Sequence, residues 1–333
     1  WHVEHLLKSD VANLAGVFDI KEDRQQAARD AGIRAYDSLD QVLSDPSVDI
    51  VTLAVPNNVH REIAVQAMAA GKNVISEKPV TVSSGDLQLM IDASKKYGKL
   101  FTVHQNRRWD ADFLSMKEIY ESGVLGDVFN IESRVHGSRG IPGDWRGKKE
   151  YGGGMMLDWG VHLIDQILQM IPEKITSVYA KMDHVTNYEV DDGFHMDLTF
   201  ESEKLVRIEV GTSNFLYLPR WYMQGENGTA VIDDWYLNGK IVCCENWDEK
   251  DVIPVKTAAG LTKTMAPRKE DTIVEHLIPK PTPDVHDFYR NVCKAIDGKE
   301  AQLITHPQMM RVMKVMEASF ESDRLHQVIP FIE

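Results

Sequence analysis

The sequence has 333 residues, a formal net charge of −14 at pH 7 and a hydrophobic content of 43%. The length allows two domains of ordinary size, and the acidic balance argues against nucleic acid or an anionic membrane as partner, since both require a basic face. Three cysteines, Cys243, Cys244 and Cys293, have no metal-ligand spacing and no disulfide framework, so we expect free thiols in a reducing cytoplasm.

Strand and helix patterns alternate through the first hundred residues. The apolar run 48–55 predicts a strand buried on both faces, and Asn57 or Asn58 is expected to cap the helix 59–70. Further strands are predicted at 13–18, 72–76 and 100–104, and further helices at 22–31 and, after a serine cap, up to Tyr97. This alternation predicts a doubly wound parallel sheet with right-handed crossovers.

The chain begins inside this pattern. Residues 2–8 have the pattern of a helix already under way, whereas a dinucleotide fold has a strand and a G-x-G-x-x-G turn before that helix. Because the absent strand would lie at the centre of the sheet, we expect the natural polypeptide to extend upstream of Trp1. Asp19 follows the 13–18 run, at the position where an acid holds the ribose 2′-hydroxyl of NAD. Lys21 could instead bind the 2′-phosphate of NADP, so NADP stays an alternative cofactor.

After residue 105 strands follow one another in series. They are predicted at 128–136, 175–184, 193–200, 205–212, 221–225, 230–234 and 240–244, with helices at 112–122, 155–170, 284–297 and 306–323, an irregular segment at 247–283, and Asp191 and Asp192 in a turn. The fold class is therefore α/β, with a Rossmann domain at 1–105. Residues 106–333 are expected to form an α+β domain with a large, open, mainly antiparallel sheet.

Polar residues follow two of the predicted parallel strands. Pro56 and Asn57 come after one strand, and Glu77 and Lys78 come after the next. Because the carboxyl ends of parallel strands face the crevice where such sheets bind ligands, we expect these residues near a ligand. A lysine there can stabilise a developing alkoxide; a simple turn or a surface salt bridge is the alternative.

Asp158 and His162 follow the glycine triplet 152–154. Their i, i+4 spacing predicts one shared helix face, and histidine titrates near neutrality, which suits general acid–base catalysis. A pair that only anchors the helix is the alternative. No Walker lysine follows the glycines. A third ligand at zinc spacing is also absent from the sequence, so no metal is predicted.

The order and spacing of these motifs resemble the glucose–fructose oxidoreductase/inositol dehydrogenase family, often called Gfo/Idh/MocA. The resemblance covers essentially the whole chain and rests on the segments 54–57 with His60, 70–74, 77–79, 106–108, 145–146 and 152–165. It implies an NAD(P)-dependent oxidoreductase of sugars, polyols or glycosides, with a second-domain sheet that commonly forms a dimer face. The missing glycine fingerprint is the one departure.

The resemblance also implies roles for individual residues. It assigns catalysis to Lys78, Asp158 and His162, although His60 on its own is expected to be structural or exposed. The cofactor-side positions that it implies are Asp19, Pro56, Asn57, His60, Glu77, Lys78, Asn106, Trp145 and Arg146.

We therefore expect a dehydrogenase of a cyclic polyol, sugar or glycoside, with NAD preferred over NADP. His162 would accept the hydroxyl proton, Lys78 would stabilise the alkoxide, and Asp158 would position the pair and raise the pKa of His162. Two alternatives stay open: a glycoside-cleaving enzyme that oxidises, eliminates and re-reduces with retained NAD, and a regulator that binds NAD without turnover. Aromatic and apolar residues at 221–223 predict a sheet face covered by a second copy, hence a homodimer or homotetramer.

Overall fold

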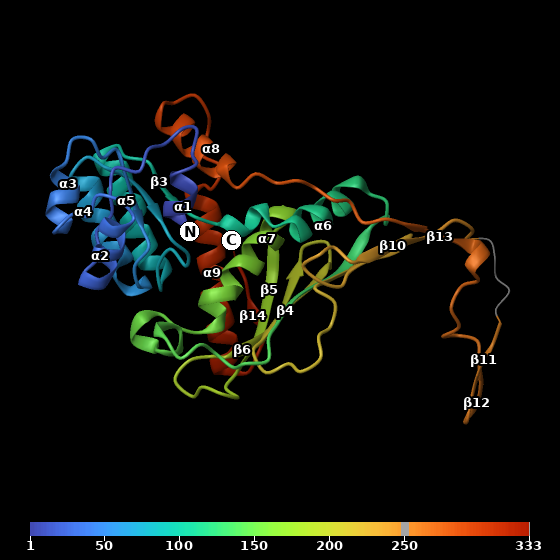
Figure 1. The fold of residues 1–333 in the computed structure, drawn as a ribbon. Helices are drawn as coiled ribbons and strands as arrows, with labels where there is room; N and C mark the ends of the chain where they lie inside the picture. Colours follow the sequence, from blue (N-terminus) through green and yellow to red (C-terminus); the bar gives the residue numbers. More distant parts are fainter. Residues whose placement is uncertain (248–252, 333) are drawn as a thin grey trace.

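Two sheets organise the computed structural model, which describes residues 1–247 and 253–332 (Figure 1). A parallel sheet has the order β1-β2-β3 and contains β1 (Ile50–Leu53), β2 (Asn73–Ser76) and β3 (Phe101–Val103). A nine-stranded sheet has the order β13-β10-β9-β8-β4-β7-β6-β5-β14, and its only parallel pair among the described residues is β4 with β7. The predicted α/β class, with a parallel sheet followed by a large mainly antiparallel one, is confirmed.

Helices surround the parallel sheet. They are α1 (His2–Leu6), α2 (Glu22–Asp30), α3 (Leu39–Ser44), α4 (His60–Ala69) and α5 (Ser84–Tyr97). Ser83 caps α5 by accepting a hydrogen bond from the amide of Asp86, and Gly98 ends it in the left-handed conformation at φ +60°. Both signals are local, which is why the sequence locates this helix well.

Two local predictions in this part are wrong. The strand expected at 13–18 is reduced to a single bridge between Val17 and Ala35, because no described strand pairs with its remaining residues. Neither asparagine caps α4. Residues Asn57–Val59 form a 3-10 turn instead, and the Asn57 side chain donates to the carbonyl of Gly152 at 2.9 Å.

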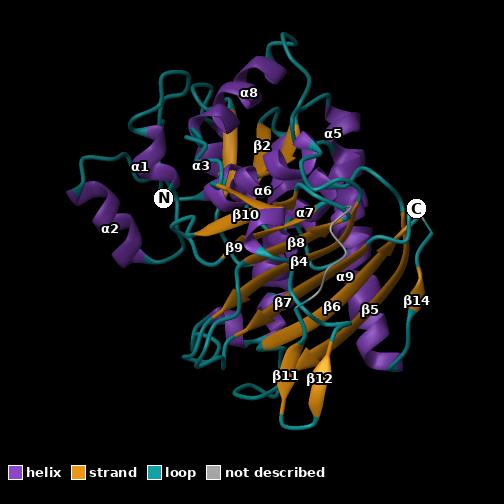
Figure 2. Cartoon of the chain, turned by 90° about the vertical axis from the view of Figure 1, so that its right-hand side faces the viewer, coloured by secondary structure: helices purple, strands orange, loops and turns teal. Residues whose placement is uncertain are grey.

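The large sheet carries helices on one face, as Figure 2 shows. The helices are α6 (Ala111–Ser122), α7 (Val161–Met170) and α9 (His306–Leu325). The strands are β4 (Val128–His136), β5 (Ile175–Asp183), β6 (Gly193–Phe200), β7 (Leu205–Gly211), β8 (Trp221–Gly225), β9 (Gly228–Ile232), β10 (Gly239–Cys244), β13 (Ile273–His276) and β14 (Ile329–Pro330). Trp221 and Met223 are fully buried in this core. They therefore cannot form the exposed apolar face that the sequence suggested, because alternate strand residues point to opposite faces.

The segment expected to be irregular contains a hairpin of β11 (Val255–Thr257) and β12 (Gly260–Thr262), which projects from the body in Figure 1. Farther along, α8 (His286–Ile296) and the loop after it return to the parallel sheet, where Thr102 Oγ1 donates to the carbonyl of Ile304 at 3.2 Å. Glu317 on α9 accepts two hydrogen bonds from Ser84 at 2.7 and 2.8 Å. No helix in the described ranges is both long and apolar enough to cross a membrane.

Candidate active site

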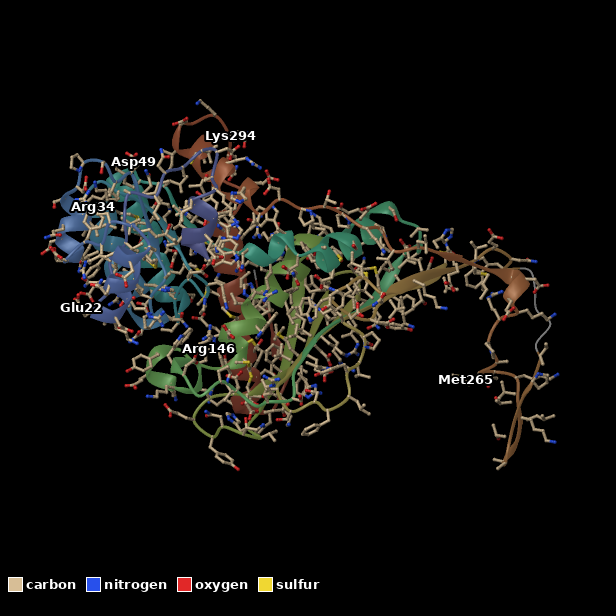
Figure 3. All side chains as sticks on the ribbon, viewed as in Figure 1. Glu22, Arg34, Asp49, Arg146, Met265 and Lys294 are labelled. Carbon is tan, nitrogen blue, oxygen red and sulfur yellow. The ribbon has the colours of Figure 1, made fainter. Side chains whose placement is uncertain are left out.

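Lys78 and Asp158 come together from the two parts of the chain. Lys78 follows β2, and its Nζ lies 2.8 Å from Oδ1 and 2.9 Å from the backbone oxygen of Asp158. The two side chains are only 18% and 13% exposed. Arg146 approaches the other carboxylate oxygen at 3.4 Å, and Figure 3 places it on the loop facing the parallel-sheet part. Asp158 therefore lies between two cations that are distant in sequence.

The glycine triplet and Asp191 fix the turn that carries Asp158. The segment Met156–Gly160 is a π-helical turn leading into α7, and Asp191 accepts from the amide of Met156 at 2.6 Å. Gly154 has φ +109°, and a Cβ there would lie 2.2 Å from Asp191 Oδ1, so only glycine fits. Burial raises the pKa of Asp191 to about 6. The sequence suggested no such supporting role for this residue.

His162 is buried on the first turn of α7. Its Nδ1 has no hydrogen-bond partner among the described residues. Burial, followed by the positive charges of Lys78 and Arg107, holds the pKa of its imidazole well below the ordinary value. The ring is therefore neutral at pH 7 and free to accept a proton.

Asp158 and His162, which the sequence suggested as an interacting pair, have different environments in the structure. In the described part of the chain, no hydrogen bond or ion pair links the two residues, because the carboxylate is occupied by Lys78 and Arg146. Asp158 is not among the main influences on the pKa of His162. The expectation that Asp158 raises this pKa is therefore not met.

Glu77 holds the loop that presents Lys78. Its Oε1 lies 2.7 Å from His2 Nε2 and 2.9 Å from His104 Nδ1, and its Oε2 accepts from the amide of Lys78 at 3.1 Å. Burial alone would raise the pKa of Glu77, but the hydrogen bonds from both histidines hold it below its ordinary value. One possible metal-ligand atom from each of His2, Glu77 and His104 lies within 4.8 Å of the other two, which is close enough to hold a metal ion.

The ends of β1 and β2 are tied together by His60. Its Nε2 lies 2.9 Å from the carbonyl oxygen of Val55, and its Nδ1 faces the carbonyls of Pro79 and Val80 at 3.2 and 3.1 Å. The ring is fully buried. Any contribution of His60 to a cofactor would therefore pass through the backbone that it holds, next to Pro56 and Asn57.

Several polar atoms at the carboxyl end of β3 lack partners. Among the described residues, the buried atoms without a hydrogen bond include His104 Nε2, Gln105 Oε1, Asn106 Oδ1 and His162 Nδ1. Buried polar groups in native proteins nearly always have a partner. Atoms that lack one, near the carboxyl end of a parallel strand, fit a polar ligand such as a nicotinamide with its substrate.

The remaining cofactor-side candidates lie farther out. Asp19 is half-buried, and its Oδ1 accepts from the amide of Lys21 at 2.8 Å. Trp145 starts the 3-10 turn Trp145–Gly147, and the guanidinium of Arg146 lies over the Trp145 ring, 4.6 Å from its centroid.

Sequence reasoning missed an aromatic and cationic wall beside His162. Trp159 lies edge-on to the His162 ring, with centroids 6.1 Å apart. Arg107 lies over Trp159, and Trp235 comes from the turn between β9 and β10. These residues are too far apart in the sequence for their spacing to predict the contact. Trp235 reaches Trp159 and Arg107 only because the large sheet places the β9–β10 turn there.

Comparisons with known proteins agree with this geometry. Residues 2–105 match a family described as "Oxidoreductase family, NAD-binding Rossmann fold", and residues 113–231 match the GFO/IDH/MocA C-terminal domain. An uncharacterized oxidoreductase of Schizosaccharomyces pombe is 30% identical over 90% of this chain and 86% of its own length. The scyllo-inositol 2-dehydrogenase (NADP⁺) of Bacillus subtilis is 28% identical over 87% of this chain and 81% of its own.

A solved structure is also similar over nearly the whole chain. The NAD-binding protein from Listeria innocua is 43% identical, with a TM-score of 0.96, over 99% of this chain and 95% of that protein. The resemblance inferred from the motifs is therefore confirmed.

Proposed function

The chain belongs to the Gfo/Idh/MocA family of NAD(P)-dependent oxidoreductases, and on this premise we propose that it oxidises a hydroxyl-bearing carbon of a polyol, sugar or glycoside, with NAD as hydride acceptor. The observation that carries the proposal is the Lys78–Asp158 ion pair beside a buried, neutral His162. Relatives named as inositol dehydrogenases support the substrate class.

The protein's own residues divide the proton chemistry between them. His162 accepts the proton of the substrate hydroxyl, which its neutral ring can do at pH 7. Lys78 donates a hydrogen bond to the developing alkoxide and stabilises its charge. Asp158 fixes the ammonium of Lys78 through a 2.8 Å contact and is a positioning residue. A bound nicotinamide supplies the hydride acceptor.

The unpartnered polar atoms at the end of β3 fit a bound cofactor. Asn106 would hold it together with Asn57, Glu77, Trp145 and Arg146. Asp19 favours NAD, because its carboxylate would bind a ribose hydroxyl and repel a 2′-phosphate.

The proposal extends to assembly as a homodimer or homotetramer. The face of the large sheet away from its helices carries Tyr179, which is 40% exposed and alternates along β5 with the buried Val178 and Ala180. Apolar surface of this kind is commonly covered by another chain.

The test is a screen of polyols, sugars and glycosides for reduction of NAD⁺ or NADP⁺ by the intact protein. We expect turnover that His162→Ala and Lys78→Ala each reduce by about two orders of magnitude or more. Glycoside cleavage without net release of reduced cofactor would instead indicate the oxidation–elimination alternative. Cofactor binding with no turnover of any substrate class would refute the proposal.

A further inference from the structure

The guanidinium of Arg107 lies over the indole ring of Trp159, with a second indole ring, that of Trp235, nearby. Its central carbon is 4.0 Å from the ring centroid of Trp159 and 5.8 Å from that of Trp235. Arginine commonly stacks on aromatic faces in this way, and the stacking leaves the N–H groups pointing out of the edge of the guanidinium plane. Trp159 therefore supports one face of the group and leaves its hydrogen-bonding edge to other partners.

Among the described residues, a single nitrogen of the Arg107 guanidinium has a hydrogen-bond acceptor. Nη1 of Arg107 donates to Asp110 at 2.8 Å, whereas Nε and Nη2 have no acceptor within the described part of the chain. The neighbouring Arg108 is different, because its Nε and Nη2 both donate to Asp165, at 2.8 and 2.6 Å. Arg107 thus keeps open the fork that binds planar oxyanions in a bidentate manner.

The open fork lies beside the residues proposed for proton transfer. Trp159, under Arg107, makes an edge contact with His162, and the positive charge of Arg107 helps to lower the pKa of that histidine. Trp235, whose ring centroid is 6.1 Å from that of Trp159, is 48% exposed. The wall therefore leads from His162 outward to solvent, where the non-reacting end of a substrate would lie.

We propose that Arg107, stacked on Trp159 and close to Trp235, binds an oxyanion on the substrate, which is therefore an acidic sugar or polyol carrying a carboxylate or a phosphate. This inference rests on the proposed dehydrogenase function, whose substrate class it narrows. The half-exposed indole of Trp235 offers apolar surface for the C–H groups of a sugar, and the guanidinium fork supplies the charge-assisted hydrogen bonds.

The test compares the affinities of matched ligands by calorimetry in the presence of NADH. D-glucuronate and D-glucose differ only at C6, gluconate and glucitol form an open-chain pair, and glucose 6-phosphate separates phosphate from carboxylate. We expect an acid to bind more tightly than its neutral partner. Arg107→Gln should reduce that preference about 30-fold, the effect of losing a hydrogen bond to a charged group. Arg107→Lys keeps the charge without the fork and should fall between the two.

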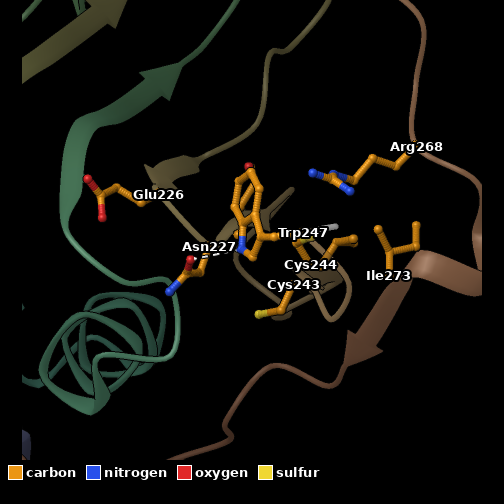
Figure 4. Close-up of a pocket in the computed structure, with 11 residues that line it drawn as sticks. Glu226, Asn227, Cys243, Cys244, Trp247, Arg268 and Ile273 are labelled. Carbon is orange, nitrogen blue, oxygen red and sulfur yellow. Dashed lines mark hydrogen bonds between the residues drawn. The ribbon is translucent and has the colours of Figure 1, made fainter. Parts of the chain in front are cut away.

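Arg268→Gln is the matched control. Arg268 also lies over an indole, 4.6 Å from the centroid of Trp247, and lines a surface pocket of about 210 Å³ drawn in Figure 4. This pocket is at the opposite ends of β9 and β10 from Trp235, so the variant should leave the acid preference unchanged. Thermal melting would check that each variant is folded.

The outcomes separate this inference from the proposed function. If the wild-type protein binds no acid more tightly than its neutral partner, or if Arg107→Gln keeps the preference, the oxyanion site is refuted even when sugars are oxidised. If the preference depends on Arg107 but no substrate class is oxidised, the oxyanion site stands and the dehydrogenase proposal fails.

Discussion

Lys78 and Asp158 should behave as one catalytic unit. Removing a preorganised donor from a developing oxyanion costs about 10²–10³ in rate, so Lys78→Met should lower kcat/KM about 300-fold. Asp158→Asn should cost less, about tenfold, because Lys78 keeps its second contact, the 2.9 Å hydrogen bond to the backbone oxygen of residue 158. If the two residues acted independently, the loss of kcat/KM in the double variant would be the product of the two single losses. If they act together, the double variant should lose little more kcat/KM than Lys78→Met alone.

The assay is kcat/KM for cofactor reduction by the intact protein with its best substrate, measured on all four members of the cycle. Lys72→Met is a suitable control, since Lys72 is a buried lysine just before β2 whose Nζ donates to the carbonyl of Asp45 at 2.7 Å, away from the site. Its kcat/KM should stay at the parent value. A double variant whose loss equals the product of the single losses would refute the pairing.

The other predictions concern pH, cofactor choice, the glycine triplet and assembly. Because burial and the charge of Lys78 lower the pKa of His162, kcat/KM for alcohol oxidation should stay flat as pH falls through the ordinary histidine range and decline only below it. Lys78→Met should move the decline to higher pH; a decline unchanged by that variant and by His162→Ala would assign the base elsewhere. The protein should prefer NAD to NADP, and Asp19→Ser should reduce the preference about tenfold; a parent preference for NADP would contradict this role. Gly154→Ala should lower the free energy of unfolding by about 2–4 kcal/mol in urea melts, because its Cβ would meet the Asp191 carboxylate at 2.2 Å and its φ is +109°, whereas Gly143→Ala, with open space around it, should be near neutral. Light scattering at micromolar concentration should show a dimer or tetramer, and a monomer would rule out the assembly proposal.

Local signals explain which elements the sequence could locate. The α5 helix has a serine cap at one end and a glycine at the other, and both act within the first or last turn. The β13 strand was missed because it lies in a proline-containing segment and forms only by pairing with β10. Strand formation of this kind depends on a distant partner more than on intrinsic preference.

The same distinction applies to the site. Lys78 could be placed from sequence because a polar residue after a buried parallel strand reaches the ligand-binding edge. The ion-pair partners of Asp158 could not be predicted from sequence, because Arg146 and Lys78 approach it from separate loops. Arg107 was passed over because only the fold shows that its neighbour Arg108 is occupied by Asp165 while its own fork is open.

The absence of a hydrogen bond between Asp158 and His162 among the described residues has a chemical consequence. A carboxylate paired with the imidazole would favour the protonated ring, which cannot accept a proton from an alcohol. Here the carboxylate instead forms ion pairs with Lys78 and Arg146. His162 is left to burial and to nearby positive charge, both of which favour its neutral form. One site thus holds a charged donor and a neutral base side by side at the same pH, and separate environments for neighbouring titratable groups are what acid–base catalysis requires.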